Sequence, residues 1–138
     1  MATAKITTFT DLTTWQKAHS LVLMIYKATE NFPKQEQFGL TSQLRRAAVS
    51  ITSNIAEGFS RQTTADKAHF YDMALGSCTE AQNQLMLARD LKFLSVNAFK
   101  TMADLSVEVH KLLNGLIKAV RSSKWPLLLA TIYLLLFP

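Results

Sequence analysis

The stretch RRAAVSITSNIAEGFSR, residues 45–61, contains two sets of side chains that each recur every three or four positions. The first set is apolar and consists of Ala47, Ala48, Ile51 and Ile55. The second set is polar, consists of Arg46, Ser50, Asn54 and Glu57, and runs beside the apolar stripe instead of opposite to it. This period predicts an amphipathic helix. Short polar side chains beside the core indicate that another backbone packs closely there.

The same helical period continues on both sides of this stretch. It predicts helices over residues 13–31, 40–59 and 64–92, and a fourth helix capped by Ser95. Pro33 and Gly58 are placed to end the first two helices, and Thr63 or Thr64 can cap the third. Because each apolar stripe needs a partner and the connections are short, the expected fold is all-α, an antiparallel up-down-up-down four-helix bundle.

Composition supports one helical domain. The chain has 138 residues, of which 49% are hydrophobic, with only four glycines and three prolines, so it is neither disordered nor turn-rich. The bundle is expected to occupy residues 1–121, followed by an apolar C-terminal extension at 122–138. Cys78 is the only cysteine, which excludes an internal disulfide framework. The first residues lack the apolar core of a signal peptide, so the expected location is the cytoplasm.

Cations are gathered on the outward face of the fourth predicted helix. This basic face consists of Lys100, Lys111, Lys118 and Arg121, and it belongs to a chain with a formal net charge of +5. Such a row of cations can follow a phosphate backbone, so these residues are candidate nucleic-acid contacts, together with Arg45, Arg61 and Lys67. The alternative is a solvated helix face with no ligand.

A second group of polar residues points to packing. On the third helix, Glu80 lies at the edge of the apolar stripe, where a carboxylate needs a partner if it is buried. We therefore predict a structural polar network of Arg46, Ser50, Asn54, Glu57 and Glu80, formed either within the bundle or across a subunit boundary. The alternative is that these side chains reach water separately.

The sequence lacks the residue patterns that are typical of catalytic, metal and cofactor sites. No glutamate is followed three residues later by a histidine, as a carboxylate-bridged metal site in a bundle requires. His19, His69 and His110 stand singly, and Cys78 falls on the core side of its helix. The sequence also lacks phosphate-binding glycine loops and a nucleophile elbow. We therefore expect no catalytic residue, no metal, no cofactor and no small-molecule substrate.

Several short motifs stand out in the chain: FP and FGL within residues 32–40, RRA and SNIAEG within 45–58, and GS at 76–77 followed by Glu80. Together they resemble those of the ribosomal-RNA intervening-sequence proteins, a four-helix-bundle family whose relatives include the accessory variability protein of diversity-generating retroelements. The resemblance covers about residues 9–121. It implies a ring, typically a homopentamer, without known enzymatic activity. In the retroelement branch it further implies a basic surface that binds nucleic acid and a reverse transcriptase.

Two functions remain open from the sequence. The first is a non-enzymatic ring that binds RNA or DNA through its outward cations, and the second is a protein-interaction scaffold whose basic charge is incidental. The apolar run at residues 125–137 is too short to span a bilayer as a helix. We expect this run to be buried in an oligomer or against a groove. The alternatives are an interfacial membrane anchor and a non-native extension.

Overall fold

The regular structure of the described chain is entirely helical. The structure, a computed structural model, describes residues 5–122. Its elements are the short 3-10 helices η1 (Phe9–Asp11) and η2 (Lys34–Glu36) and the long helices α1 (Thr13–Thr29), α2 (Leu40–Ser60), α3 (Thr64–Asp90) and α4 (Val96–Ser122). The four predicted helices are confirmed, with small differences at their ends. The apolar run at 125–137 lies outside the described residues.

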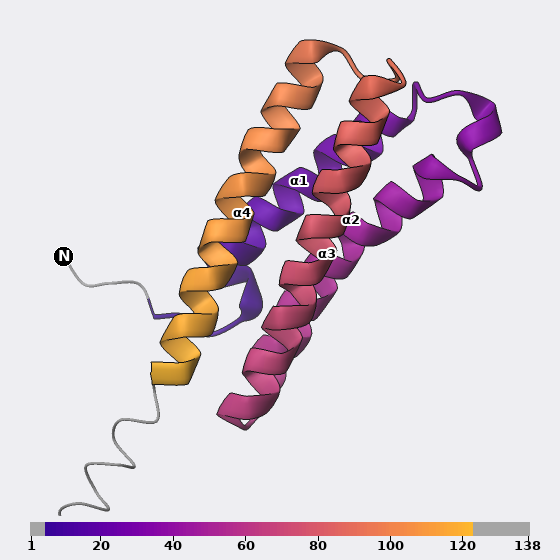
Figure 1. Cartoon of the computed structure of the whole chain (residues 1–138). Helices are drawn as coiled ribbons and strands as arrows, with labels where there is room; N and C mark the ends of the chain where they lie inside the picture. Colours follow the sequence, from indigo (N-terminus) through magenta and orange to yellow (C-terminus); the bar gives the residue numbers. More distant parts are fainter. Residues whose placement is uncertain (1–4, 123–138) are drawn as a thin grey trace, which may run out of the picture.

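The long helices form an up-down-up-down bundle, as predicted (Figure 1). Each helix packs on the next one along the chain, and α1 also packs on α4, which closes the bundle. The most extensive packing joins α2 to α3. Short connections such as residues 61–63 leave a helix no room except beside its predecessor, running the opposite way. Within residues 5–122, none of the helices combines the length and apolar character that crossing a bilayer requires.

Two predicted caps are present at the starts of α3 and α4. The side chain of Thr63 accepts a hydrogen bond of 3.1 Å from the backbone N–H of Asp66. Ser95 accepts one of 3.1 Å from the N–H of Ala98. Each cap satisfies a backbone donor that has no partner inside its helix. The sequence pattern therefore located both helix starts from local chemistry.

The end of α3 was harder to predict. The helix stops at Asp90, and Lys92 adopts a left-handed backbone conformation with φ of 63°. Beyond it, the N–H of Phe93 donates to the carbonyl of Ala88 at 2.9 Å. This conformation usually requires glycine or asparagine, so a lysine there gave no signal that the helix stops.

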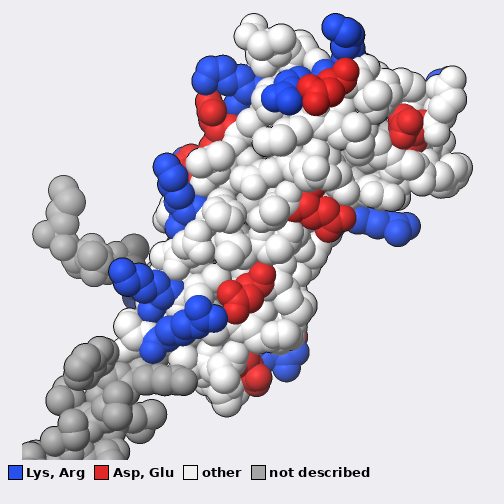
Figure 2. Space-filling view, in the orientation of Figure 1, with Lys and Arg blue, Asp and Glu red and all other residues white. Residues whose placement is uncertain are grey.

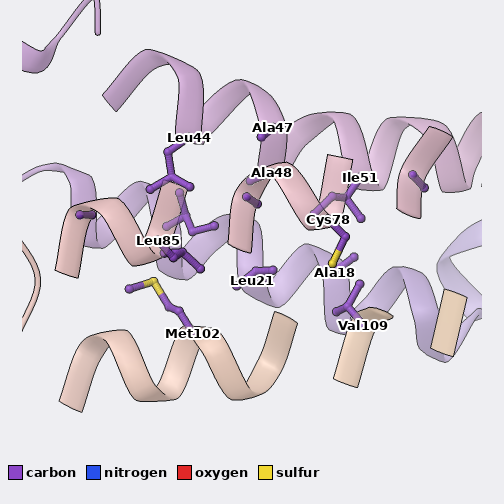
Figure 3. Close-up of a cluster of buried hydrophobic side chains, with 14 of the residues drawn as sticks. Ala18, Leu21, Leu44, Ala47, Ala48, Ile51, Cys78, Leu85, Met102 and Val109 are labelled. Atoms are coloured by element: carbon purple, nitrogen blue, oxygen red, sulfur yellow. The ribbon is translucent and has the colours of Figure 1, made fainter. Parts of the chain in front are cut away.

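The core runs the length of the bundle and receives side chains from all four long helices. In Figure 3, Leu21 from α1, Leu44 and Ile51 from α2, Leu85 from α3 and Met102 from α4 point toward one another. Their exposed fractions do not exceed 2%. Ala47 and Ala48 of α2 and Ala74 and Ala81 of α3 are also buried in this core, and such small side chains let neighbouring backbones approach closely. The predicted core position of Cys78 is confirmed, since its side chain is fully buried.

The role predicted for Gly58 was wrong. Gly58 does not end α2, which continues to Ser60. A β-carbon built at position 58 would lie 2.6 Å from Cε1 of Tyr71, closer than side chains tolerate. The glycine therefore leaves room for the buried Tyr71 ring to pack against α2, so its role is to permit this tertiary contact and not to end the helix.

Candidate nucleic-acid interface

The four cations of the basic face all lie on α4 and are exposed. Lys100, Lys111, Lys118 and Arg121 are open to solvent. Figure 2 shows Lys and Arg side chains following the edge of the molecule that α4 forms, with acidic side chains between some of them. One helix therefore presents this row of charge on a rigid support.

These four cations differ in what they touch. Lys100 pairs with Asp104 at 2.9 Å, and Arg121 pairs with Asp72 of α3 at 3.0 Å. Lys111 and Lys118 form no ion pair or hydrogen bond with any residue that the structure describes. Exposed ion pairs contribute little stability, so Lys100 and Arg121 can exchange their carboxylates for a phosphate at small cost. Lys111 and Lys118 have no described carboxylate to release before they bind a phosphate.

Arg45 is turned into the molecule. Its Nε donates to Oγ1 of Thr29 at 2.8 Å, and its guanidinium lies over the ring of Tyr26 at 4.6 Å from the centroid. Thr29 is itself buried and donates to the carbonyl of Ile25. The contacts join α2 to α1, so they give Arg45 a structural role. The two partners lie three residues apart on one face of α1, a spacing that the sequence analysis did not use.

Arg61 and Lys67 are occupied at the C-terminal end of α2. Arg61 pairs with Glu57 at 2.6 Å and lies over the ring of Phe70. Lys67 Nζ donates to the carbonyl of Phe59 at 2.7 Å, one of the last carbonyls of α2. A cation there satisfies an orphan acceptor and favours the negative end of the helix dipole. Both side chains therefore stabilise the connection between α2 and α3.

The predicted polar network forms in one place. Ser50 of α2 and Ser77 of α3 share a hydrogen bond of 2.8 Å between their hydroxyls. Asn54 donates to the carbonyl of Ser50 at 2.9 Å and to its hydroxyl at 3.1 Å. The short polar side chains predicted that another backbone packs closely on this stripe, and this seam of hydroxyls and an amide shows that the backbone is that of α3.

The charged members of the predicted network do not meet within one chain. Glu57 binds Arg61, and Glu80 accepts a hydrogen bond of 3.2 Å from Nε2 of Gln84. Arg46 is exposed and has no polar partner among residues 5–122. All three charges reach water, which solvates them without a partner. The form of the network that would cross a subunit boundary stays a prediction.

The structure also shows an open groove that the sequence did not indicate. It has a volume of about 660 Å³ and lies over α2, between Tyr26 of α1 and the loop that holds Phe38. Phe38 is 91% exposed, and Val49 on the floor is 39% exposed. Loop residues such as Phe38 have no helical period, so only the three-dimensional arrangement brings these apolar groups together.

The described histidines do not gather into a site. His19 stacks on Trp15 with 4.6 Å between ring centroids, and His69 packs edge-on against Phe70. His110 is half-buried on α4. In the described part of the chain, no three His, Cys, Asp or Glu side chains are grouped so that they could hold a metal ion.

Burial raises the pKa of the Cys78 thiol from its ordinary value near 9 to about 11. Because the folded state holds this proton more tightly than the unfolded state, its contribution to stability is complete below pH 9. We expect this contribution to be lost as the pH rises toward 11, by about 1.4 kcal/mol for each pH unit.

The measurement is urea unfolding at several pH values between 8 and 11. Burial also raises the pKa of Tyr71, so wild type is compared with Cys78→Ala, which keeps the tyrosine. The free energy of unfolding of the wild type should fall more steeply with pH than that of the variant. Equal slopes would contradict the prediction.

These observations define a class: an antiparallel four-helix bundle with a close α2–α3 seam and a row of cations on α4. Residues 10–115 match the 23S rRNA-intervening sequence protein family. The chain belongs to this family, in agreement with the resemblance seen in its motifs.

A solved relative shares the fold. The chain is similar to the crystal structure of a protein of unknown function from the S23 ribosomal protein family of Bacteroides thetaiotaomicron, with 27% sequence identity and a TM-score of 0.69. The similarity covers 76% of this chain and 95% of the other. A comparison with curated proteins finds no match.

Proposed function

We propose that the protein is a non-enzymatic, ring-forming four-helix bundle that binds nucleic acid, RNA or DNA, through the basic face of α4. The observation that supports this most directly is the pair Lys111 and Lys118. Both ammonium groups are exposed, and neither is neutralised by a described residue. A ligand that brings negative charge would give them the partners that the described chain does not supply.

The spacing of these lysines suits a phosphate backbone. Seven residues of α-helix span about 10 Å, so the two lysines lie two turns apart on nearly the same side of α4. Three successive base pairs of a duplex cover a similar length, at about 3.4 Å each along the axis. Lys111 and Lys118 can therefore contact phosphates of one strand.

Ring formation would strengthen this weak site. Two lysines supply little affinity alone, but a ring repeats them around its circumference, and linked sites bind together far more tightly than single ones. The expectation of a ring comes from the family resemblance. The family description names an intervening sequence of 23S rRNA. A ribosomal RNA fragment is therefore a natural first ligand to test.

One observation favours the scaffold function instead. Arg45, Arg61 and Lys67 are occupied by contacts within the chain. Three of the seven candidate cations therefore have structural roles, and the surface left for a nucleic acid is limited to α4. A protein partner would need apolar contact, which the groove over α2 can give.

The test reverses the charges of Lys111 and Lys118. We expect the double variant Lys111→Glu/Lys118→Glu to bind a mixed-sequence RNA or DNA duplex about tenfold more weakly or worse, because two phosphate contacts become repulsions. Fluorescence anisotropy at several salt concentrations measures the affinity. With duplex DNA, the slope of log K against log salt should become shallower by about 0.9 for each phosphate that the variant no longer neutralises.

The matched control is Lys34→Glu, which makes the same kind of charge change at an exposed position of η2. Its affinity should stay near that of the wild type after allowance for net charge. Circular dichroism confirms that both proteins remain helical. If wild type shows no salt-dependent binding, or if all three proteins bind equally, the nucleic-acid function is wrong and the scaffold function is favoured.

A further inference from the structure

We propose that the groove over α2 is one half of an interface with a second copy of this chain, and that a stripe on α3 of that copy is the other half. The inference rests on the ring of the proposed function and assigns the two surfaces that would build it. Arg46 in the groove would pair with Glu80 in the stripe.

The groove combines apolar surface with a cation. Phe38, Tyr26 and Val49 are exposed on 91%, 41% and 39% of their surfaces. Arg46 also lines the groove and has no polar partner in the described part of the chain. The other cation in its wall, Arg45, is bound to Thr29. None of the described residues that line the groove is acidic.

The stripe on α3 has the opposite charge. Met73, Glu80 and Leu87 follow one another at seven-residue intervals, so they lie almost in line along the helix. Met73 and Leu87 are 40% and 46% exposed. Between them the Glu80 carboxylate is steadied by Gln84 at 3.2 Å, but no described cation neutralises it. The stripe therefore offers a carboxylate flanked by apolar side chains.

Charge decides which occupant fits. An apolar partner that covered the groove would remove water from Arg46 without supplying a negative charge, and a buried unpaired charge is strongly destabilising. A nucleic acid in the groove would satisfy Arg46, but it would leave the apolar stripe and Glu80 without a partner. A second copy whose stripe lies on the groove brings a carboxylate to Arg46 and gains a guanidinium for its own Glu80 in one contact.

The two surfaces differ, and this matters for assembly. The groove is made by α1, the loop before α2, and α2, whereas the stripe belongs to α3. If the groove of one copy meets only the stripe of the next, each dimer keeps one groove and one stripe free, so further copies add until the ring closes. This head-to-tail use of the two surfaces builds a ring, whereas a contact that used both surfaces of each copy at once would build a symmetric dimer.

The experiment reverses each charge and then mixes the variants. The full chains of wild type, Arg46→Glu, Glu80→Arg and the double variant are compared by size-exclusion chromatography with light scattering at one protein concentration. We expect each single variant to lose at least half of the oligomer mass and the double variant to regain it. Lys27→Glu, which reverses an exposed cation of α1 outside the groove, is the matched control and should keep the wild-type mass.

Mixing tests whether the pair forms between chains. An equal mixture of Arg46→Glu and Glu80→Arg chains should reach a higher mass than either variant alone, because alternating chains place opposite charges at every contact of a five-membered ring but one. A pair within one chain would give no recovery, since each variant carries two like charges. No recovery, or full mass in both single variants, would overturn the interface while an oligomeric wild type keeps the proposed ring. A monomeric wild type would overturn both.

Discussion

The variant Leu21→Ala is expected to lose about 2–5 kcal/mol of the free energy of unfolding, because it removes a fully buried side chain and leaves a cavity that close-packed helices cannot collapse to fill. Leu21 has no exposed surface and lies in the core with Leu44 and Leu85. Urea unfolding followed by circular dichroism measures the loss as a lower midpoint with an unchanged slope. Protein concentration is held fixed, since assembly adds to apparent stability.

Leu23 supplies the matched control two residues further along α1. Its side chain is 59% exposed, so Leu23→Ala should change stability by less than about 0.5 kcal/mol. Both variants make the same chemical change in the same helix, and the difference between them therefore measures burial. Similar losses in the two variants would contradict the described packing of α1.

The second large effect is expected at Gly58. The variant Gly58→Ala should be less stable than wild type by about 1–3 kcal/mol, because its methyl group would collide with the Tyr71 ring and would lie in tight contact with Cβ of Phe70. Tyr71 is only 2% exposed, so its ring has little room to move. The gain in helix propensity, about 1 kcal/mol, offsets part of this cost. Thermal and urea unfolding both measure the net change.

A second variant, Gly76→Ala, measures the effect of helix propensity without a steric collision. A β-carbon at position 76 would meet no described atom within 4 Å, and the position is exposed on α3. Gly76→Ala should therefore raise stability by about 0.5–1 kcal/mol through propensity alone. If Gly58→Ala and Gly76→Ala shift stability equally in the same direction, the contact between Gly58 and Tyr71 does not constrain the bundle.

The fold could be predicted because its signals are local. Four stripes of helical period, together with hydroxyl caps at Thr63 and Ser95, gave the elements and most of their ends. Short connections then left one arrangement for neighbouring helices. The errors came where a tertiary contact or an unusual backbone decides the outcome, as at Gly58 and Lys92.

The candidate site could be predicted only in part. The exposed face of α4 follows from helical period, so the exposure of Lys111 and Lys118 could be predicted from sequence. The contacts of Arg45 with Thr29 and Tyr26 join residues sixteen or more positions apart, and no local pattern contains them. A charge count treats all seven cations alike, whereas their availability depends on which carboxylates, carbonyls and rings the fold brings near.

The close pairing of α2 with α3 has a consequence for how the chain acquires its structure. Residues 61–63 are all that separate these two helices, so bringing them together closes a very short loop and costs little chain entropy. The contact between α1 and α4 closes a loop of more than sixty residues and costs more. We therefore expect the bundle to nucleate as a central hairpin, onto which the first and last helices dock once their partner surfaces exist.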